Sequence, residues 1–228
     1  MKTSSLAAFL ADRLRRVLTA VFGLMIFGFA YYMQMTVTIG MSPWHTFNQG
    51  LSLIFPITVG QASILVSVAV VCIDLLLREP IGVGTLLDAV TVGWWVDLFD
   101  SMHLLPRVTG LLPSVAMLLG SITISCVAQC IYMRARLSCG PRDAMMVALG
   151  RRVKRISMGT VFVAIQLVVL ALGVLMGGDL GLGTLINLLA TGVIMDAVYK
   201  LLRFEPRDLQ QEGLQDTLRE FRKALEQK

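Results

Sequence analysis

The chain has few charged residues and few histidines. Asp, Glu, Lys and Arg make up 15% of its 228 residues, and two histidines are present. Soluble domains are nearer a quarter charged, so this shortage argues against a soluble fold. A hydrophobic content of 56% and a mean hydropathy of +0.74 are instead typical of a membrane protein. We interpret the net charge of +5 as Lys and Arg held in cytoplasmic loops, and expect no nucleic-acid binding.

The sequence also lacks the patterns of metal sites and of enzymes. Cys72, Cys126, Cys130 and Cys139 form no CxxC pair and have no His cluster beside them, so we expect buried, inert thiols. The apolar part of the chain contains no Ser/His pair, no His/Glu motif and no paired carboxylates at catalytic spacing. We therefore expect no metal, no cofactor and no enzymatic activity.

One stretch of the sequence occurs twice. Residues 81–99 read IGVGTLLDAVTVGWWVDLF, and residues 180–198 read LGLGTLINLLATGVIMDAV. At an offset of 99 the two copies share Gly82, Gly84, Thr85, Leu86, Gly93 and Asp97. Asp88 falls opposite Asn187, its near-isostere, and the duplication reaches further because Pro43 aligns with Pro141 and Gly60 with Gly159. The pattern predicts a duplicated membrane protein.

Apolar runs long enough to cross about 30 Å of hydrocarbon alternate with two shorter ones. Each shorter run begins with Pro43 or Pro141 at a helix-start position and is too short to cross. We expect four segments: an amphipathic N-terminal segment, two membrane repeats and a charged C-terminal helix, over residues 1–16, 17–99, 110–202 and 205–228. The expected spans are residues 17–38, 60–77, 81–99, 110–133, 158–176 and 180–202.

The distribution of Lys and Arg predicts the number of crossings. With six crossings and both termini in the cytoplasm, every Lys and Arg except Arg107 lies on the inner side. Three crossings per repeat make the second repeat enter the membrane upside down, a plan typical of transporters. We predict an all-α integral membrane protein of the bacterial inner membrane, with six transmembrane helices in two inverted three-helix repeats. Each repeat carries a short re-entrant or interfacial helix.

The segments PWHTFNQGL and GVGT, and above all GPRD with the second GLGT, make the chain similar to a known family. It resembles the YczE-like bacterial membrane proteins, which are related to the YitT group, over residues 17–202. The resemblance implies a polytopic bacterial inner-membrane protein and specifies no substrate. Asn187 is a departure within the repeat, because it lacks the charge that Asp88 can carry.

The matched polar residues Asp88 and Asn187 are the first candidate site. Seven residues into its span, Asp88 lies about 10 Å below the membrane surface, and Asn187 lies at a similar depth from the other side. The functional interpretation is a central substrate or proton site with Asp88 as the titrating group. Thr85, Thr184 and Asn187 would be the hydrogen-bonding groups, and Gly84 and Gly183 would start or unwind a helix and leave free N–H groups that can meet an anion. The alternative is packing, with Asp88 bonded to a neighbouring hydroxyl and the glycines letting helices touch.

The starts of the two short helices are the second candidate site. They carry Trp44 and His45 in one copy and Arg142 and Asp143 in the other. Uncapped helix starts attract anionic groups, and Arg142 would add a positive charge. The alternatives are a lipid-facing Arg142, an Asp143 that complements the helix dipole, and a structural His45. Asp74 with Arg78, and Asp196 with Lys200, are expected to pair at i, i+4.

The sequence leaves two classes of function open. The first is a small-molecule transporter or exporter with a central site between the two repeats. An anionic substrate, proton coupling and a homo-oligomer are each compatible with it. The second is a non-transporting accessory protein that holds a partner through its spans and basic cytoplasmic face. The lipid bilayer is the partner that both require.

Overall fold

A computed structural model describes residues 3–57, 59–209 and 211–226, and this part of the chain is helical almost throughout. Its helices are α1 (Thr3–Met35), α2 (Pro43–Ile54), α3 (Val59–Leu76), α4 (Val83–Ser101), α5 (Leu111–Arg134), α6 (Pro141–Arg152), α7 (Met158–Leu175), α8 (Leu182–Leu201) and α9 (Leu214–Glu226), with a 3-10 turn at Pro206–Asp208. The all-helical fold class is confirmed. The order long, short, long, long occurs twice, in a first half (α1–α4) and a second half (α5–α8).

The first helix is longer than predicted. We expected a separate amphipathic segment over residues 1–16, but α1 runs without a break from Thr3 to Met35, and residues 1–2 lie outside the described part. No Gly or Pro occurs before Gly23, so nothing in the sequence interrupts the helix. The predicted segment is therefore the first part of the same helix as the first span.

The two short helices begin where their prolines predicted. α2 and α6 have 12 residues each, with Pro43 and Pro141 in the first turn and extended backbone at the preceding Ser42 and Gly140. Twelve residues rise about 18 Å, which is well short of the hydrocarbon thickness. These helices cannot cross a bilayer by themselves.

Length and apolar composition mark four described helical segments as able to cross a membrane: Phe9–Met35, Leu111–Arg134, Met158–Leu175 and Leu182–Leu201. The apolar part of α3, Gln61–Leu76, is shorter. α4 has 19 residues but contains Asp88, Asp97 and Asp100, which lower its apolar character. Outward-facing leucines such as Leu175 and Leu201, 83% and 82% exposed, fit contact with lipid. The chain is therefore a membrane protein.

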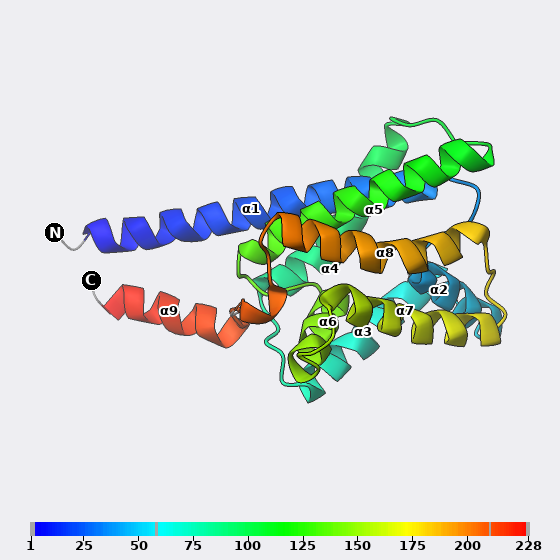
Figure 1. Cartoon of the computed structure of the whole chain (residues 1–228). Coiled ribbons are helices and arrows are strands. Elements are labelled where there is room, and N and C mark those ends of the chain that lie inside the picture. Colours follow the sequence, from blue (N-terminus) through cyan, green and yellow to red (C-terminus); the bar gives the residue numbers. More distant parts are fainter. Residues whose placement is uncertain (1–2, 58, 210, 227–228) are drawn as a thin grey trace.

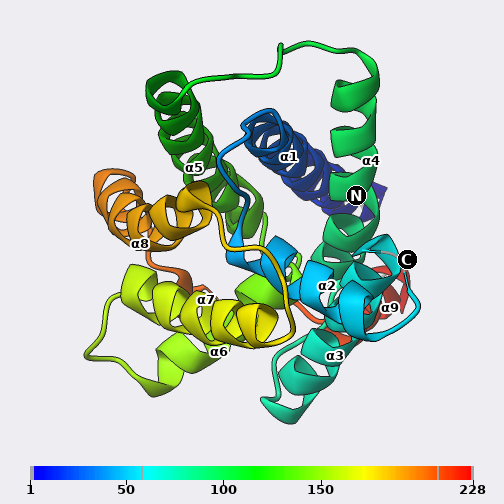
Figure 2. The ribbon, with the colours of Figure 1, turned by 90° about the vertical axis from the view of Figure 1, so that its right-hand side faces the viewer.

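The halves are interlocked (Figure 2). α1 packs along α5 and α4, and α5 packs on α8. Each short helix also packs on the third helix of the other half, α2 on α7 and α6 on α3. α1 comes close to α5 at Gly23, where an added Cβ would lie 2.8 Å from the Cβ of Tyr132. Neither half could keep this arrangement without the other.

Both ends of the chain lie at the same end of the bundle (Figure 1). We expected one helix over residues 205–228, but residues 209 and 211–213 are not helical and separate the 3-10 turn from α9, while residues 210 and 227–228 lie outside the described part. α9 contacts α1, where the Arg13 guanidinium bonds the carboxylates of Glu212 and Glu220. Ion pairs thus fasten α9, and the segment just before it, to the N-terminal helix.

Candidate functional site: a polar cavity between the two halves

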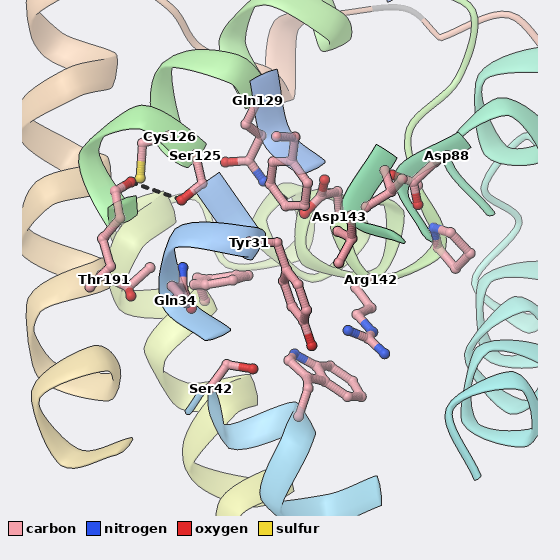
Figure 3. Close-up of a pocket in the computed structure, with 18 of the residues that line it drawn as sticks. Tyr31, Gln34, Ser42, Asp88, Ser125, Cys126, Gln129, Arg142, Asp143 and Thr191 are labelled. Atoms are coloured by element: carbon pink, nitrogen blue, oxygen red, sulfur yellow. Dashed lines mark hydrogen bonds between the residues drawn. The ribbon is translucent and has the colours of Figure 1, made fainter. Parts of the chain in front are cut away.

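A cavity of about 390 Å³ lies at the centre of the bundle (Figure 3), and all eight helices from α1 to α8, or their cap residues, contribute to its wall. This volume is within the range of small-molecule sites. Its charged and amide-bearing residues are Gln34, Asp88, Asp97, Gln129, Arg142, Asp143, Gln166 and Asn187. Many of the polar groups buried in this membrane protein thus gather around one space, which suits a polar ligand.

The two short helices meet in this cavity. Trp44 and Arg142 hold the same position in α2 and α6, one residue after the proline. The Arg142 guanidinium lies over the Trp44 ring, 4.6 Å from its centroid, in a cation–π contact. Tyr31 lies beside Arg142, and in the described part of the chain Arg142 forms no ion pair (Figure 3). Arg142 therefore faces the cavity and not the lipid.

Asp88 lies against the start of α6. A Cβ built on Gly140, the residue that caps this helix, would be 2.4 Å from Oδ2 of Asp88, so a glycine is needed for the contact. The Asp88 side chain is half-buried and lines the cavity. No described residue bonds its carboxylate, so the expected hydroxyl partner of the packing interpretation is not among them. Asp88 is a polar group free to meet a ligand.

Asn187 lines the same cavity from α8. Its amide nitrogen donates to Oε1 of Gln34 at 3.1 Å, and the Thr191 hydroxyl donates to the Asn187 backbone carbonyl at 2.6 Å. The structure thus brings Asp88 and Asn187 to one space. It gives them different surroundings, because Asn187 is held by neighbours and Asp88 is not.

Asp143 is the end of a buried hydrogen-bonded chain. The Gln129 amide donates to Oδ1 of Asp143 at 2.7 Å, and the Tyr199 hydroxyl donates to Oε1 of Gln129 at 2.5 Å. All three side chains are buried, which favours complete hydrogen bonding over an unpaired polar group. These two hydrogen bonds fix the amide of Gln129 and one carboxylate oxygen of Asp143 at the cavity wall.

The Gly-x-Gly-Thr elements lie outside the cavity and join the halves. The Gly84 N–H donates to the Leu137 carbonyl at 2.5 Å, and the Gly183 N–H donates to the Ile39 carbonyl at 2.6 Å. Leu137 and Ile39 precede the short helices of the opposite halves, so the two bonds correspond. Thr85 is buried and donates to the Cys139 carbonyl at 2.8 Å. Packing accounts for Gly84 and Gly183, because their N–H groups are bonded to carbonyls and cannot meet an anion.

Two further candidates do not reach the cavity. Thr184 is buried at the start of α8, where its hydroxyl would lie 2.9 Å from a Cβ added to Gly40. His45 is half-buried in α2 and is not part of the cavity wall. Of the ten residues singled out in the sequence, Asp88, Asn187, Trp44, Arg142 and Asp143 meet at the cavity, and Thr85, Thr184, Gly84, Gly183 and His45 lie around it.

The expected i, i+4 ion pairs are absent from the described part of the chain. Oδ1 of Asp196 accepts the Gly159 N–H at 2.8 Å, and Lys200 is exposed. Asp74 is 2% exposed and its Oδ1 has no partner, while Arg78 has a left-handed backbone that turns it out of the helix. The pairing prediction was wrong because spacing along one helix says nothing about a competing neighbour or the helix end.

Sequence reasoning did not single out Gln34, Gln129, Gln166, Tyr31 or Thr191. Three glutamines within apolar spans were a usable signal, since an amide in hydrocarbon needs a partner. Tyr31 and Gln129 also correspond at the same offset as Pro43 and Pro141. Asp97 was recognised as a repeated residue but not as part of the cavity wall.

Fold and site define an all-helical membrane protein whose buried polar cavity lies between two halves. Residues 14–200 match the model of a family of unknown function, DUF6198. The chain is 30% identical to the uncharacterised membrane protein YczE of Bacillus subtilis over 162 residues, which cover 69% of this chain and 72% of that protein. It is 27% identical to an uncharacterised protein of Haemophilus influenzae over 175 residues, or 77% and 79% of the two chains. No solved structure matches. The chain belongs to the YczE-like family, which confirms the resemblance seen in the sequence.

Proposed function

We propose that the protein is a membrane transporter for a polar small molecule, which binds in the cavity between the halves. The observation that carries the proposal is the cavity wall, because every helix from α1 to α8 contributes to it. A purely structural bundle has no need to collect Arg142, Asp88 and several amides around an internal space in a membrane, where polar groups are costly.

The proposed topology has six crossings, α1, α3, α4, α5, α7 and α8, in two inverted repeats in the bacterial inner membrane. An even number of crossings agrees with the two termini at one end of the bundle (Figure 1). The counted charges agree with a cytoplasmic position for that end. As a crossing helix, α4 would turn Asp88 and Asp97 to the cavity and place Asp100 near its end.

In this proposal the substrate carries a negatively charged group. Arg142 supplies the positive charge, and stacking on Trp44 holds its guanidinium in place. The first turns of α2 and α6 also line this space, and the N-terminus of a helix favours an anion. Asp88, which no described residue bonds, serves as the acceptor of a second substrate group or of a coupled proton.

The test begins with purified protein in detergent and a metabolite library, scored by thermal stabilisation. A ligand at 100 times its Kd stabilises the folded state by about 2.7 kcal/mol. The hit is then measured for uptake into proteoliposomes. Asp88→Asn and Arg142→Gln are expected to lower uptake at least about tenfold at unchanged melting temperature, since each removes a charge-assisted contact. Asp100→Asn, on the same helix but outside the cavity wall, is the control.

Wild-type uptake in Asp88→Asn would remove that residue from the site. A second candidate function, the accessory protein, is favoured by one observation: Leu218 and Phe221 on α9 are 68% and 45% exposed. A library without hits, together with a stable co-purifying protein that is lost when α9 is deleted, would support this role in place of transport.

A further inference from the structure

The second half of the bundle contains a tightly closed seam between α7 and α8. A Cβ built on Gly159 would lie 2.1 Å from the Gly192 carbonyl, so the two helices touch backbone to backbone. The Asp196 carboxylate accepts the Gly159 N–H, a free group of the first turn of α7. The Val163 side chain packs on Gly192, since its Cγ2 would lie 2.4 Å from a Cβ built on that glycine. Four residues therefore make the seam: Gly159, Val163, Gly192 and Asp196.

The same four positions in the first half are Gly60, Ile64, Gly93 and Asp97, at the offset of 99. Three of the four residues are identical, and Ile64 stands for Val163. The arrangement of Ile64, Gly93 and Asp97 is nevertheless different. α7 packs along α8, whereas α3 and α4 show no comparable packing in the described part of the chain. No described atom lies within 4 Å of a Cβ built on Gly93, Asp97 is exposed, and Ile64 is 67% exposed.

The separated positions lie at the mouth of the cavity. Gly93 and Asp97 are both exposed and both line the cavity, and so does Ser63, the neighbour of Ile64. At the closed seam the lining residues Thr191, Met195 and Gln166 are buried, and the seam residue Asp196 does not line the cavity. The seam lies at the start of α7 and the mouth at the start of α3, which are opposite ends of the bundle (Figure 1).

We propose that these two sets of residues are alternating gates, and that a second state closes α3 on α4 in the way that α7 is now closed on α8. In that state Gly93 packs on the start of α3, Ile64 covers it, and the Asp97 carboxylate accepts the Gly60 N–H. The seam between α7 and α8 then opens. The inference rests on the proposed transport function and adds to it the residues that expose the cavity to each side in turn.

Identical residues at identical spacing can make the same contacts. A glycine pair and an aspartate at identical spacing have already formed a stable seam in this molecule, so the first half has the same groups available. No described residue bonds Asp97 as Gly159 bonds Asp196, and Gly93, whose added Cβ would meet no described atom within 4 Å, weakens α4 without any gain in packing. Both features are explained if the groups are used in another state of the same chain.

Disulfide formation in two engineered cysteine pairs reports whether each gate closes, and the measurement needs no substrate. Cys72 is exposed and is first replaced by serine, whereas the other three cysteines are buried. Ile64→Cys with Gly93→Cys reports closure of the mouth. Val163→Cys with Gly192→Cys reports the closed seam, where the matched Cβ positions are near enough for a disulfide. The protein in proteoliposomes is oxidised, denatured and treated with maleimide-polyethylene glycol, which counts the thiols left free in the monomer band.

We expect each pair to form a disulfide in its own chain, and a chain with all four cysteines to lose two thiols and never four. Failure of the 64–93 pair to form, although both cysteines react with a small maleimide, overturns the proposal. So does the loss of all four thiols in one molecule, because the two gates would then close together. Chains with single cysteines identify bonds to the native thiols and to a second copy.

The aspartates are tested by the rate of the 64–93 bond. Asp196→Asn weakens the seam by replacing a charged acceptor with a neutral one, so this bond should form about fivefold faster. Asp97→Asn should slow it by a similar factor, and Asp100→Asn should leave it unchanged. Equal rates in all three variants overturn the role of the aspartates.

The gates and the transport function can fail separately. Mutually exclusive bonds in a protein that takes up no library compound would uphold the gates and leave transport without support. Uptake by a protein in which the 64–93 bond never forms would overturn the gates alone.

Discussion

Corresponding residues in the two halves of this protein fall into two groups. Gly84 and Gly183 make the same backbone bond, each to the loop before the short helix of the other half. Asp97 and Asp196 do not, since one is exposed at the cavity and the other is bonded to a helix start. In the proposed alternation the first group keeps its bonds in both states, whereas the second group changes contacts between them. Identical residues at matched positions of a repeat therefore show which contact each half is able to form, but not that both halves form it.

The fixed group gives a prediction on stability. In Gly84→Ala the new Cβ would lie 2.2 Å from the Ser138 carbonyl oxygen, so backbone must shift. We expect a loss of about 1–3 kcal/mol in the free energy of unfolding. Gly120→Ala is the matched control, because no described atom lies within 4 Å of its Cβ and alanine favours a helix by up to about 1 kcal/mol. Thermal unfolding in detergent measures both, and equal melting temperatures would contradict the tight contact at Gly84.

The sequence predicted some of the individual residues of the site. Asp88 and Asn187 were found because they are polar, matched and placed deep in apolar runs. Arg142 was found because it follows a helix-start proline, but whether it faced lipid or protein depended on the partner Trp44 from the other half. The bond between Asp196 and Gly159 joins two helices across 37 positions, and no helical spacing contains that information.

At the scale of elements, the short helices are the parts that build the cavity. α2 and α6 each pack on the third helix of the opposite half, and their first turns meet at Trp44 and Arg142. Proline at the start and insufficient length were readable in the sequence, and the structure confirms both. Their docking across the halves was not readable, because it is set by the fit of α2 on α7 and of α6 on α3.

The C-terminal helix α9 should contribute little to the stability of the membrane part. It packs on α1, and its described contacts include the exposed ion pair between Arg13 and Glu220 and a bond from its first residue, Leu214, to Ile81. Deletion of residues 216–228 keeps the Leu214 N–H bond to the Ile81 carbonyl and Glu212, which holds both Arg13 and Arg16. We expect the free energy of unfolding to change by less than about 1 kcal/mol, as exposed ion pairs contribute little. A large drop in melting temperature would show that α9 belongs to the folded membrane part.

The whole molecule has its termini at one end, and this makes the proposed topology testable. In the Cys72→Ser background, Thr109→Cys places a thiol in the exposed loop between α4 and α5, and Asp208→Cys places one near the C-terminus. A membrane-impermeant maleimide should label residue 109 in intact spheroplasts and residue 208 only after the membrane is opened, as the positive-inside rule requires. Labelling of both residues from outside would contradict the six-crossing topology.

The sequence by itself determined that this is an all-helical membrane protein, because apolar runs of sufficient length leave the backbone few other ways to satisfy its hydrogen bonds in lipid. It also determined the duplication, the starts of the short helices and the family. Only the tertiary structure decided that residues from eight helices enclose one cavity, and that matched residues of the two halves differ in their contacts. Both depend on packing between segments distant in the chain, and identical residues at matched positions do not determine which of them form the contact.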